Sequence, residues 1–237
     1  MSTILSNDTM LEFKDDPKKL MMELDLFLSI YYCDRKILYN PDLEEIAARK
    51  IPQPLKDLYS FVGKYPGKHG TLHTHDTLFF YPGIFKEKLC IVGENQGVWS
   101  CGTEIEGDDP PVYLIDWTTE KENDADWEYV CSSLSEFLVS FCLREAFFAS
   151  TYRSVFKGRI ENTVSNIRKQ DYEVILLWQG KYNQIKDYVV PQIDSFYLIE
   201  DSILLWDMWD SSWWGTNYKN ADRAMNLIQV ELNSDRT

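Results

Sequence analysis

Four stretches of the chain place apolar residues three and four positions apart, the spacing of one face of an α-helix. The first follows Asp16 and Pro17, a capping residue and a proline at the first helical position. The second spans 42–50, the third follows prolines at 52 and 54, and the fourth follows a capping box at Ser133. The predicted apolar faces are Leu20, Met21, Leu24, Phe27, Leu28 and Tyr31; Leu43, Ile46 and Ala47; Leu55, Leu58, Tyr59 and Val62; and Leu134, Phe137, Leu138, Phe141 and Cys142.

Between the third and fourth helices the pattern changes to short β-branched and aromatic runs separated by turn residues. The turn 93–97 contains two glycines and Asn95, residues that tolerate a positive φ, so it predicts a hairpin. Pro110 and Pro111 cannot donate to a sheet ladder and belong at the start of a strand. The predicted strands are Leu78–Tyr81, Leu89–Val92, Val98–Thr103, Val112–Trp117 and Trp127–Cys131.

The last ninety residues are rich in strand-like segments. These segments are Tyr172–Trp178, Phe196–Ile199 and Ile203–Met208, and a basic stretch at 156–170 predicts a helix that joins them to the preceding part. The sequence therefore predicts an α+β fold: a mixed, mainly antiparallel sheet covered by helices, with a β-rich C-terminal extension. The helix after Ser133 is expected to cover one face of the sheet. We expect residues 1–50 to form a helical segment packed on the core, 51–150 the core, and 151–237 an extension or a further part of the same globule.

Three short motifs resemble the SUKH superfamily of fungal cell-wall regulators and bacterial immunity proteins. They are the proline-led segment Pro52–Tyr65, the turn Glu94–Gly97 followed by Trp99 and Gly102, and Asp109-Pro110-Pro111-Val112-Tyr113. The resemblance covers Ile51 to Phe148. It implies a binding fold without catalytic residues, and most often an immunity protein that neutralises a cognate toxin.

Charge narrows the classes of partner. The 237 residues include 38 acidic and 24 basic side chains, a formal net charge of −14. Such a chain repels nucleic acid and anionic lipid, and its field attracts a basic protein. We expect a cytoplasmic protein, because no signal peptide or membrane-spanning run is visible and the five cysteines, an odd number, read as reduced thiols.

The predicted partner-binding residues lie in two acidic loops and in a tryptophan-rich stretch. The loops flank the strand 112–117 at opposite ends. Their carboxylates are expected to be solvated and would complement a basic toxin such as a nuclease. Aromatic anchors rimmed by charge are typical of interfaces, whereas Trp117, Trp127 and Trp178 are expected in the core. The candidate partner-binding residues are Glu104, Glu106, Asp108, Asp109, Glu122, Asp124, Asp126, Trp209, Trp213 and Trp214.

Two other functions remain open. A regulatory or scaffold protein, like the fungal members of the superfamily, would use the same binding fold. A metal-dependent hydrolase would use His69, His73 and His75, because imidazoles at such spacing can ligate zinc. However, no phosphate-binding loop or nucleophile motif accompanies these histidines. We therefore predict a protein without enzymatic activity, metal or cofactor.

Overall fold

The structure is a computed structural model. It describes residues 10–32, 42–62, 76–118, 125–150, 152–157, 160–169, 171–183, 193–199, 203–208 and 211–216. Gly63 and the histidine loop lie outside these residues. None of the helices in the described ranges is long and apolar enough to cross a membrane.

Helices begin where the capping residues predicted them. Asp16 accepts a hydrogen bond from the backbone N–H of Lys19 (3.1 Å), and Ser133 accepts one from that of Glu136 (3.1 Å). Side-chain oxygens at these positions satisfy N–H groups that lack a partner within the helix. The elements are a 3₁₀ helix η1 (Met10–Phe13), α1 (Pro17–Tyr31), α2 (Leu43–Ala48), α3 (Gln53–Val62), α4 (Leu134–Phe148) and α5 (Ile160–Arg168).

The first sheet is antiparallel, and its central hairpin lies where the turn residues predicted it. Strand β3 pairs with β4 across the turn, where Gly97 has a φ of +75°, a conformation that residues with a Cβ rarely adopt. The strand order is β1-β3-β4-β5-β6, with β2 also paired to β3. The strands are β1 (Thr77–Leu78), β2 (Ile84–Phe85), β3 (Lys88–Gly93), β4 (Trp99–Thr103), β5 (Val112–Asp116) and β6 (Glu128–Cys131).

A second antiparallel sheet, in the order β7-β11-β10-β9-β8, forms the C-terminal part of the fold. The predicted joining helix at 156–170 is only partly right, because residues up to 157 form an edge strand and the helix begins at Ile160. A strand before α5 was not visible in the basic pattern of that stretch. The strands are β7 (Tyr152–Lys157), β8 (Val174–Lys181), β9 (Ile193–Ile199), β10 (Ile203–Met208) and β11 (Ser211–Thr216). The expected α+β fold with a β-rich C-terminal part is confirmed.

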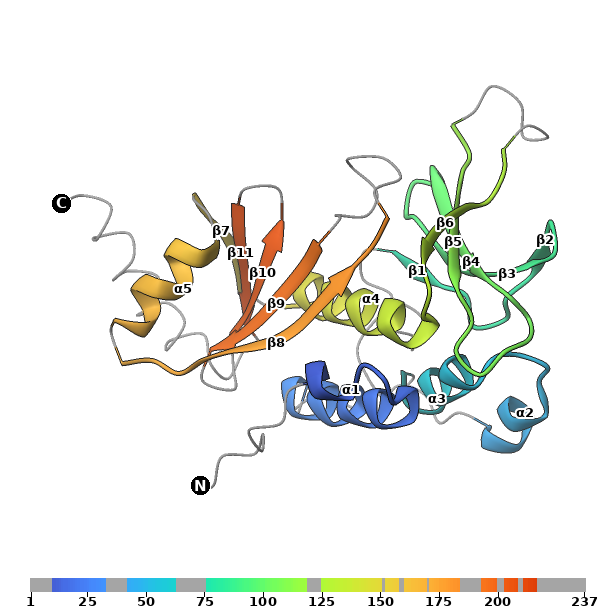
Figure 1. Ribbon diagram of the computed structural model, residues 1–237, viewed down its shortest axis with the longest axis horizontal. Coiled ribbons are helices and arrows are strands. Elements are labelled where there is room, and N and C mark those ends of the chain that lie inside the picture. The colour runs from blue at the N-terminus through green and yellow to red at the C-terminus, as the bar shows by residue number, and fades with distance from the viewer. Residues whose placement is uncertain are drawn as a thin grey trace.

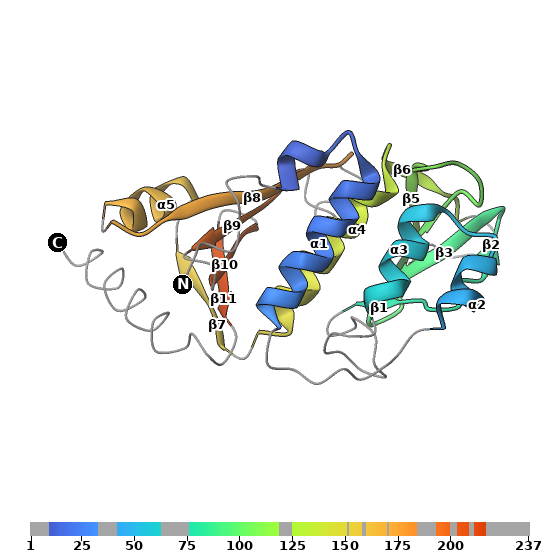
Figure 2. The same ribbon diagram turned by 90° about the horizontal axis from the view of Figure 1, so that it is seen from below.

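Helix α4 lies between the two sheets, with α1 alongside it (Figures 1 and 2). Thirteen of its 15 residues are buried, including Phe137, Phe141 and Phe147. We expected it to cover a single sheet face, but a helix that packs on all sides has to be buried all round. One core cluster joins α1, α3 and α4 to inner side chains of both sheets, such as Leu114 and Phe196.

A smaller core lies on the far face of the second sheet, beneath α5 (Figure 1). Ile160, Val164 and Ile167 of this helix pack against Leu205 and Trp214 of the sheet. Alternation along each strand explains the division, because successive side chains point to opposite faces. The second sheet is therefore covered on both faces where α4 and α5 lie.

Two charged side chains are buried between α4 and the second sheet. The Nε of Arg144 lies 3.8 Å from Oδ2 of Asp194, and among the described residues neither atom has a hydrogen-bond partner. Oδ1 of Asp194 accepts a hydrogen bond from the indole of Trp206 (2.6 Å). Burial raises the pKa of Asp194 to about 6, although Arg144 and the bond from Trp206 oppose this shift. The other titratable groups near this pair are Asp76, Cys101, Tyr182 and Asp207.

The raised pKa of Asp194 predicts a specific dependence of stability on pH. The folded chain holds the proton of Asp194 up to about pH 6, whereas the unfolded chain releases it near the ordinary value of 3.8. The contribution of Asp194 to stability is therefore full below about pH 4 and falls by ~3 kcal/mol as the pH rises to about 6. Urea unfolding at intervals from pH 4 to 7 should show that Asp194→Asn gains stability relative to the wild type as the pH rises. A constant difference between the two proteins would contradict the prediction.

Candidate protein-binding surface

The first acidic loop, 104–109, lies between β4 and β5, and its four carboxylates are partly or fully exposed. Glu106 forms an ion pair with Lys50 (3.1 Å), and both side chains are about four-fifths exposed, at 81% and 80%. Asp108 is exposed, and Gly107 turns the loop with a φ of +114°. An exposed ion pair adds little to stability, so the pair with Lys50 does not keep Glu106 from a partner. Asp108 is accessible because its side chain is exposed.

Asp109 corrects the expectation that this loop is uniformly solvated. Its carboxylate accepts hydrogen bonds from the hydroxyls of Ser133 (2.6 Å) and Ser135 (2.9 Å), and from the backbone N–H of Ser135 (2.7 Å). The positive end of the α4 helix dipole also stabilises a carboxylate at this position. Asp109 therefore fixes the start of α4 to the loop before β5.

Replacing Asp109 with alanine should lower the free energy of unfolding by about 2 kcal/mol, because three hydrogen bonds to a charged group are lost at a buried helix start. Chemical denaturation followed by far-ultraviolet circular dichroism measures this change. Asp108→Ala, one residue away and exposed, is the matched control and should change stability by less than about 0.5 kcal/mol. Equal effects of the two changes would show that the contacts of Asp109 contribute nothing.

The second acidic connection is only partly described. Asp126 is exposed, and its Oδ1 accepts a hydrogen bond from the backbone N–H of Trp127 (2.9 Å). It precedes β6 near the Asp116 end of β5, so the two acidic loops do lie at opposite ends of that strand. Glu122, Asp124 and Trp209 lie outside the described residues.

The predicted division of the tryptophans into core residues and binding residues is wrong in both groups. Trp214 is buried beneath α5 with 4% of its surface exposed, and the half-buried Trp213 packs 6.2 Å from the ring of Phe147. By contrast, Trp117 and Trp127, expected in the core, are half-buried on the outside of the first sheet. Trp178 is fully buried, as expected.

The first sheet has one face turned away from the helices (Figures 1 and 2). Cross-strand pairing aligns Cys90, Gly102, Tyr113 and Tyr129 in a row on this face, while their neighbours Cys101 and Leu114 point into the core. Among the described residues, five aromatic side chains cover the face. We call this set the outer aromatic surface: Phe85, Tyr113, Trp117, Trp127 and Tyr129.

The two tryptophans of the outer aromatic surface are held in fixed positions. The indole N–H of Trp127 donates to the carbonyl of Phe85 (3.1 Å), and that of Trp117 donates to the hydroxyl of Ser100 (3.0 Å). Trp127 lies against Gly102, where an added Cβ would come within 2.7 Å of its ring. The ring of Phe85 contacts both indoles edge-on. The surface is therefore organised before any partner binds.

A lysine and a carboxylate flank Tyr113 on this face. Nζ of Lys88 lies 4.1 Å from the centre of the Tyr113 ring and 3.2 Å from Oε1 of Glu104, which also accepts the hydroxyl of Tyr113 (2.9 Å). The hydrogen bond from Tyr113 lowers the pKa of Glu104, and Lys88 adds to this effect. Glu104 is therefore ionised at neutral pH and contributes a negative charge at the rim of the surface.

A sequence signal for this surface exists but is ambiguous. In the run Asp126-Trp127-Glu128-Tyr129, aromatic and acidic residues alternate, which places both rings on one face of β6. Alternation cannot tell which face of the strand a helix will cover, so it is equally compatible with the predicted core position of Trp127 and with the observed outward one. The missing information was the position of α4, which covers the opposite face.

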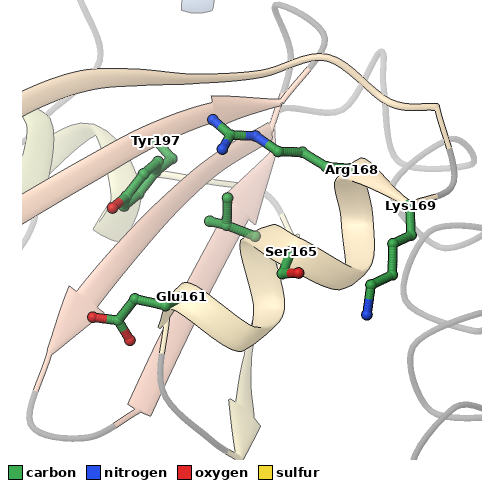
Figure 3. Close-up of a pocket in the computed structure, with 6 residues that line it drawn as sticks. Glu161, Ser165, Arg168, Lys169 and Tyr197 are labelled. Atoms are coloured by element: carbon green, nitrogen blue, oxygen red, sulfur yellow. The ribbon is translucent and has the colours of Figure 1, made fainter.

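A groove lies beside α5, on the second sheet (Figure 3). It encloses about 480 Å³ between this helix and Tyr197 of β9. One acid, Glu161, and two bases, Arg168 and Lys169, surround an otherwise largely apolar lining. These charges do not converge on one point as catalytic or metal-binding groups do.

No metal site emerges from the described ranges, in which no three histidine, cysteine or acidic side chains are grouped to hold an ion. The predicted alternative ligands, His69, His73 and His75, lie outside those ranges. Of the cysteines, Cys101, Cys131 and Cys142 are buried and free, and burial raises the pKa of each thiol. Such thiols are poor nucleophiles at neutral pH.

Compared with known proteins, the chain matches no family model, and no significant match was found among curated proteins or solved structures. The SUKH resemblance therefore stays a prediction based on its three motifs.

Proposed function

We propose that this chain is a non-enzymatic protein-binding protein, and specifically an immunity protein that neutralises a basic bacterial toxin. The proposal combines the SUKH-like motifs with a surface suited to a protein partner. The toxin is expected to be a basic protein such as a nuclease, because the chain carries a formal charge of −14.

The observation that carries the proposal is the outer aromatic surface. A sheet face with five aromatic side chains would ordinarily be covered, and in the described part of the chain no helix covers it. Large apolar patches rimmed by polar groups mark interaction sites, and aromatic residues are the commonest binding anchors. Glu104, which accepts the hydroxyl of Tyr113, supplies an acidic group at the rim of the surface.

Co-expression tests this function. The protein encoded next to this chain in its genome is produced alone and together with it, and growth of the host is measured. We expect the neighbour alone to arrest growth, and this chain to restore growth and to form a complex with the neighbour in vitro. A neighbour that neither binds this chain nor is inhibited by it would contradict the proposal.

The exposed carboxylates should mainly set the rate of association. Charges at the rim of an interface steer the encounter, and screening shortens their reach to about 8 Å at physiological salt. Asp108→Asn with Asp126→Asn should slow association with the toxin in stopped-flow measurements and make it less sensitive to salt. Asp109 is left intact because it supports α4. An association rate that depends equally on salt in both proteins would rule out steering by these loops.

A further inference from the structure

Two lysines already show how the outer aromatic surface holds a positive charge. Nζ of Lys88 lies 4.1 Å from the ring centre of Tyr113, with the carboxylate of Glu104 3.2 Å away. Nζ of Lys86 lies 5.9 Å from the ring centre of Phe85 and donates to the carbonyl of Ala125. In both cases a ring and an oxygen acceptor share one ammonium group, a combination that favours a cation at a partly desolvated site.

The remaining rings of this surface carry no such cation from the described part of the chain. Among the described residues, no lysine or arginine lies over Trp117, Trp127 or Tyr129, although Tyr129 is 43% exposed and both tryptophans are partly exposed. The indole N–H groups of both tryptophans are used within the chain. Their ring faces are therefore what they can offer a partner, and tryptophan is the aromatic residue that attracts cations most strongly.

The charge of the chain indicates where further cations would come from. Acidic side chains outnumber basic ones by 38 to 24. The ammonium groups of Lys86 and Lys88 already lie over the rings of Phe85 and Tyr113. Glu104 lies beside Tyr113 on this face and contributes a negative charge at its rim. The described part of the chain thus leaves these rings open to a cation supplied by another molecule.

We infer that the partner presents arginine side chains to the outer aromatic surface, with guanidinium groups stacked on Trp117 and Trp127. This inference rests on the proposed function, because it specifies the chemistry of the protein that binds there. A planar guanidinium stacks on an aromatic ring and is more weakly hydrated than an ammonium group, and arginine is enriched at protein interfaces.

A titration without the partner tests the inference. N-acetyl-arginine amide is added to the ¹⁵N-labelled chain, and the indole N–H signals of the tryptophans are followed by two-dimensional NMR. N-acetyl-citrulline amide, which has nearly the same shape but no charge, is the matched probe. Trp117→Phe and Trp127→Phe assign the two signals, and the buried Trp178 serves as an internal reference.

The signals of Trp117 and Trp127 should shift with the arginine probe, at least several-fold more than with the citrulline probe, and the shifts should shrink in high salt. The signal of Trp178 should stay in place. Equal shifts with both probes, or shifts confined to other parts of the chain, would overturn the inference.

The outcomes separate this inference from the proposed function. If the toxin binds and Trp127→Ala weakens its binding, but the arginine probe leaves the indoles unchanged, the surface binds protein by other chemistry and the inference fails alone. If the indoles respond to arginine but no toxin is neutralised, the proposed function fails and the ring chemistry stands.

Discussion

Replacing Arg144 with methionine is expected to lower the free energy of unfolding by about 3 kcal/mol at pH 7. Methionine fills much of the same space without the charge, so the change isolates the electrostatic role of the guanidinium. Burial alone would lower the pKa of Arg144, but the carboxylates of Asp194 and Asp76 raise it above its ordinary value. Removing the cation leaves both carboxylates buried without it, which is the costly way to break such a pair.

The dependence on pH distinguishes this effect from a packing defect. Asp194 is protonated below about pH 6, so the loss caused by Arg144→Met should be smaller at pH 5 than at pH 7. Arg153→Met is the matched control, since Arg153 is exposed just beyond the end of α4 and should cost less than about 1 kcal/mol. Urea unfolding of the three proteins at both pH values provides the comparison. A loss that is the same at pH 5 and pH 7 would contradict the electrostatic explanation.

Trp127→Ala should weaken binding of the toxin by roughly 30-fold or more, about 2 kcal/mol, as expected for a central aromatic anchor. The ring is already positioned by Gly102 and by the carbonyl of Phe85, so little ordering is needed when the partner binds. Most of the change should appear in the dissociation rate. Surface plasmon resonance with the purified toxin measures both rates.

Met22→Ala is the control for this experiment. Met22 is also a large exposed apolar residue, 62% exposed, but it lies on α1, on the helical side of the first sheet. Its removal should leave the affinity unchanged within about twofold. Thermal unfolding of each variant checks that the fold is retained. A Trp127→Ala protein that is folded and binds with wild-type affinity would exclude Trp127 from the interface.

Local sequence signals predicted most elements of the fold. Asp16 and Ser133 marked helix starts because their side chains can cap a backbone N–H. The hairpin at 93–97 was visible because its turn needs a residue with positive φ, supplied by Gly97. A helix cap or a tight turn depends only on residues a few positions apart, so the sequence pattern is enough to predict it.

The arrangement of the layers was not predictable in the same way. Helix α4 was expected to cover one face of a sheet, whereas two sheets enclose it. Whether Trp127 or Trp214 is buried depends on which sheet face α4 and α5 occupy, and the alternation of side chains is the same in either case. The acidic residues had the same difficulty, because only the fold brings Asp109 to Ser133 and Ser135.

The central claim is that the outer aromatic surface is where a protein partner binds. Hydrogen–deuterium exchange of the chain, alone and in complex with its toxin, tests this claim most directly. The account predicts slower exchange in the complex at 112–117 and 127–131, with little change in α5 and in the second sheet. Protection confined to α5 and the second sheet, with exchange at 112–117 and 127–131 unchanged, would contradict it.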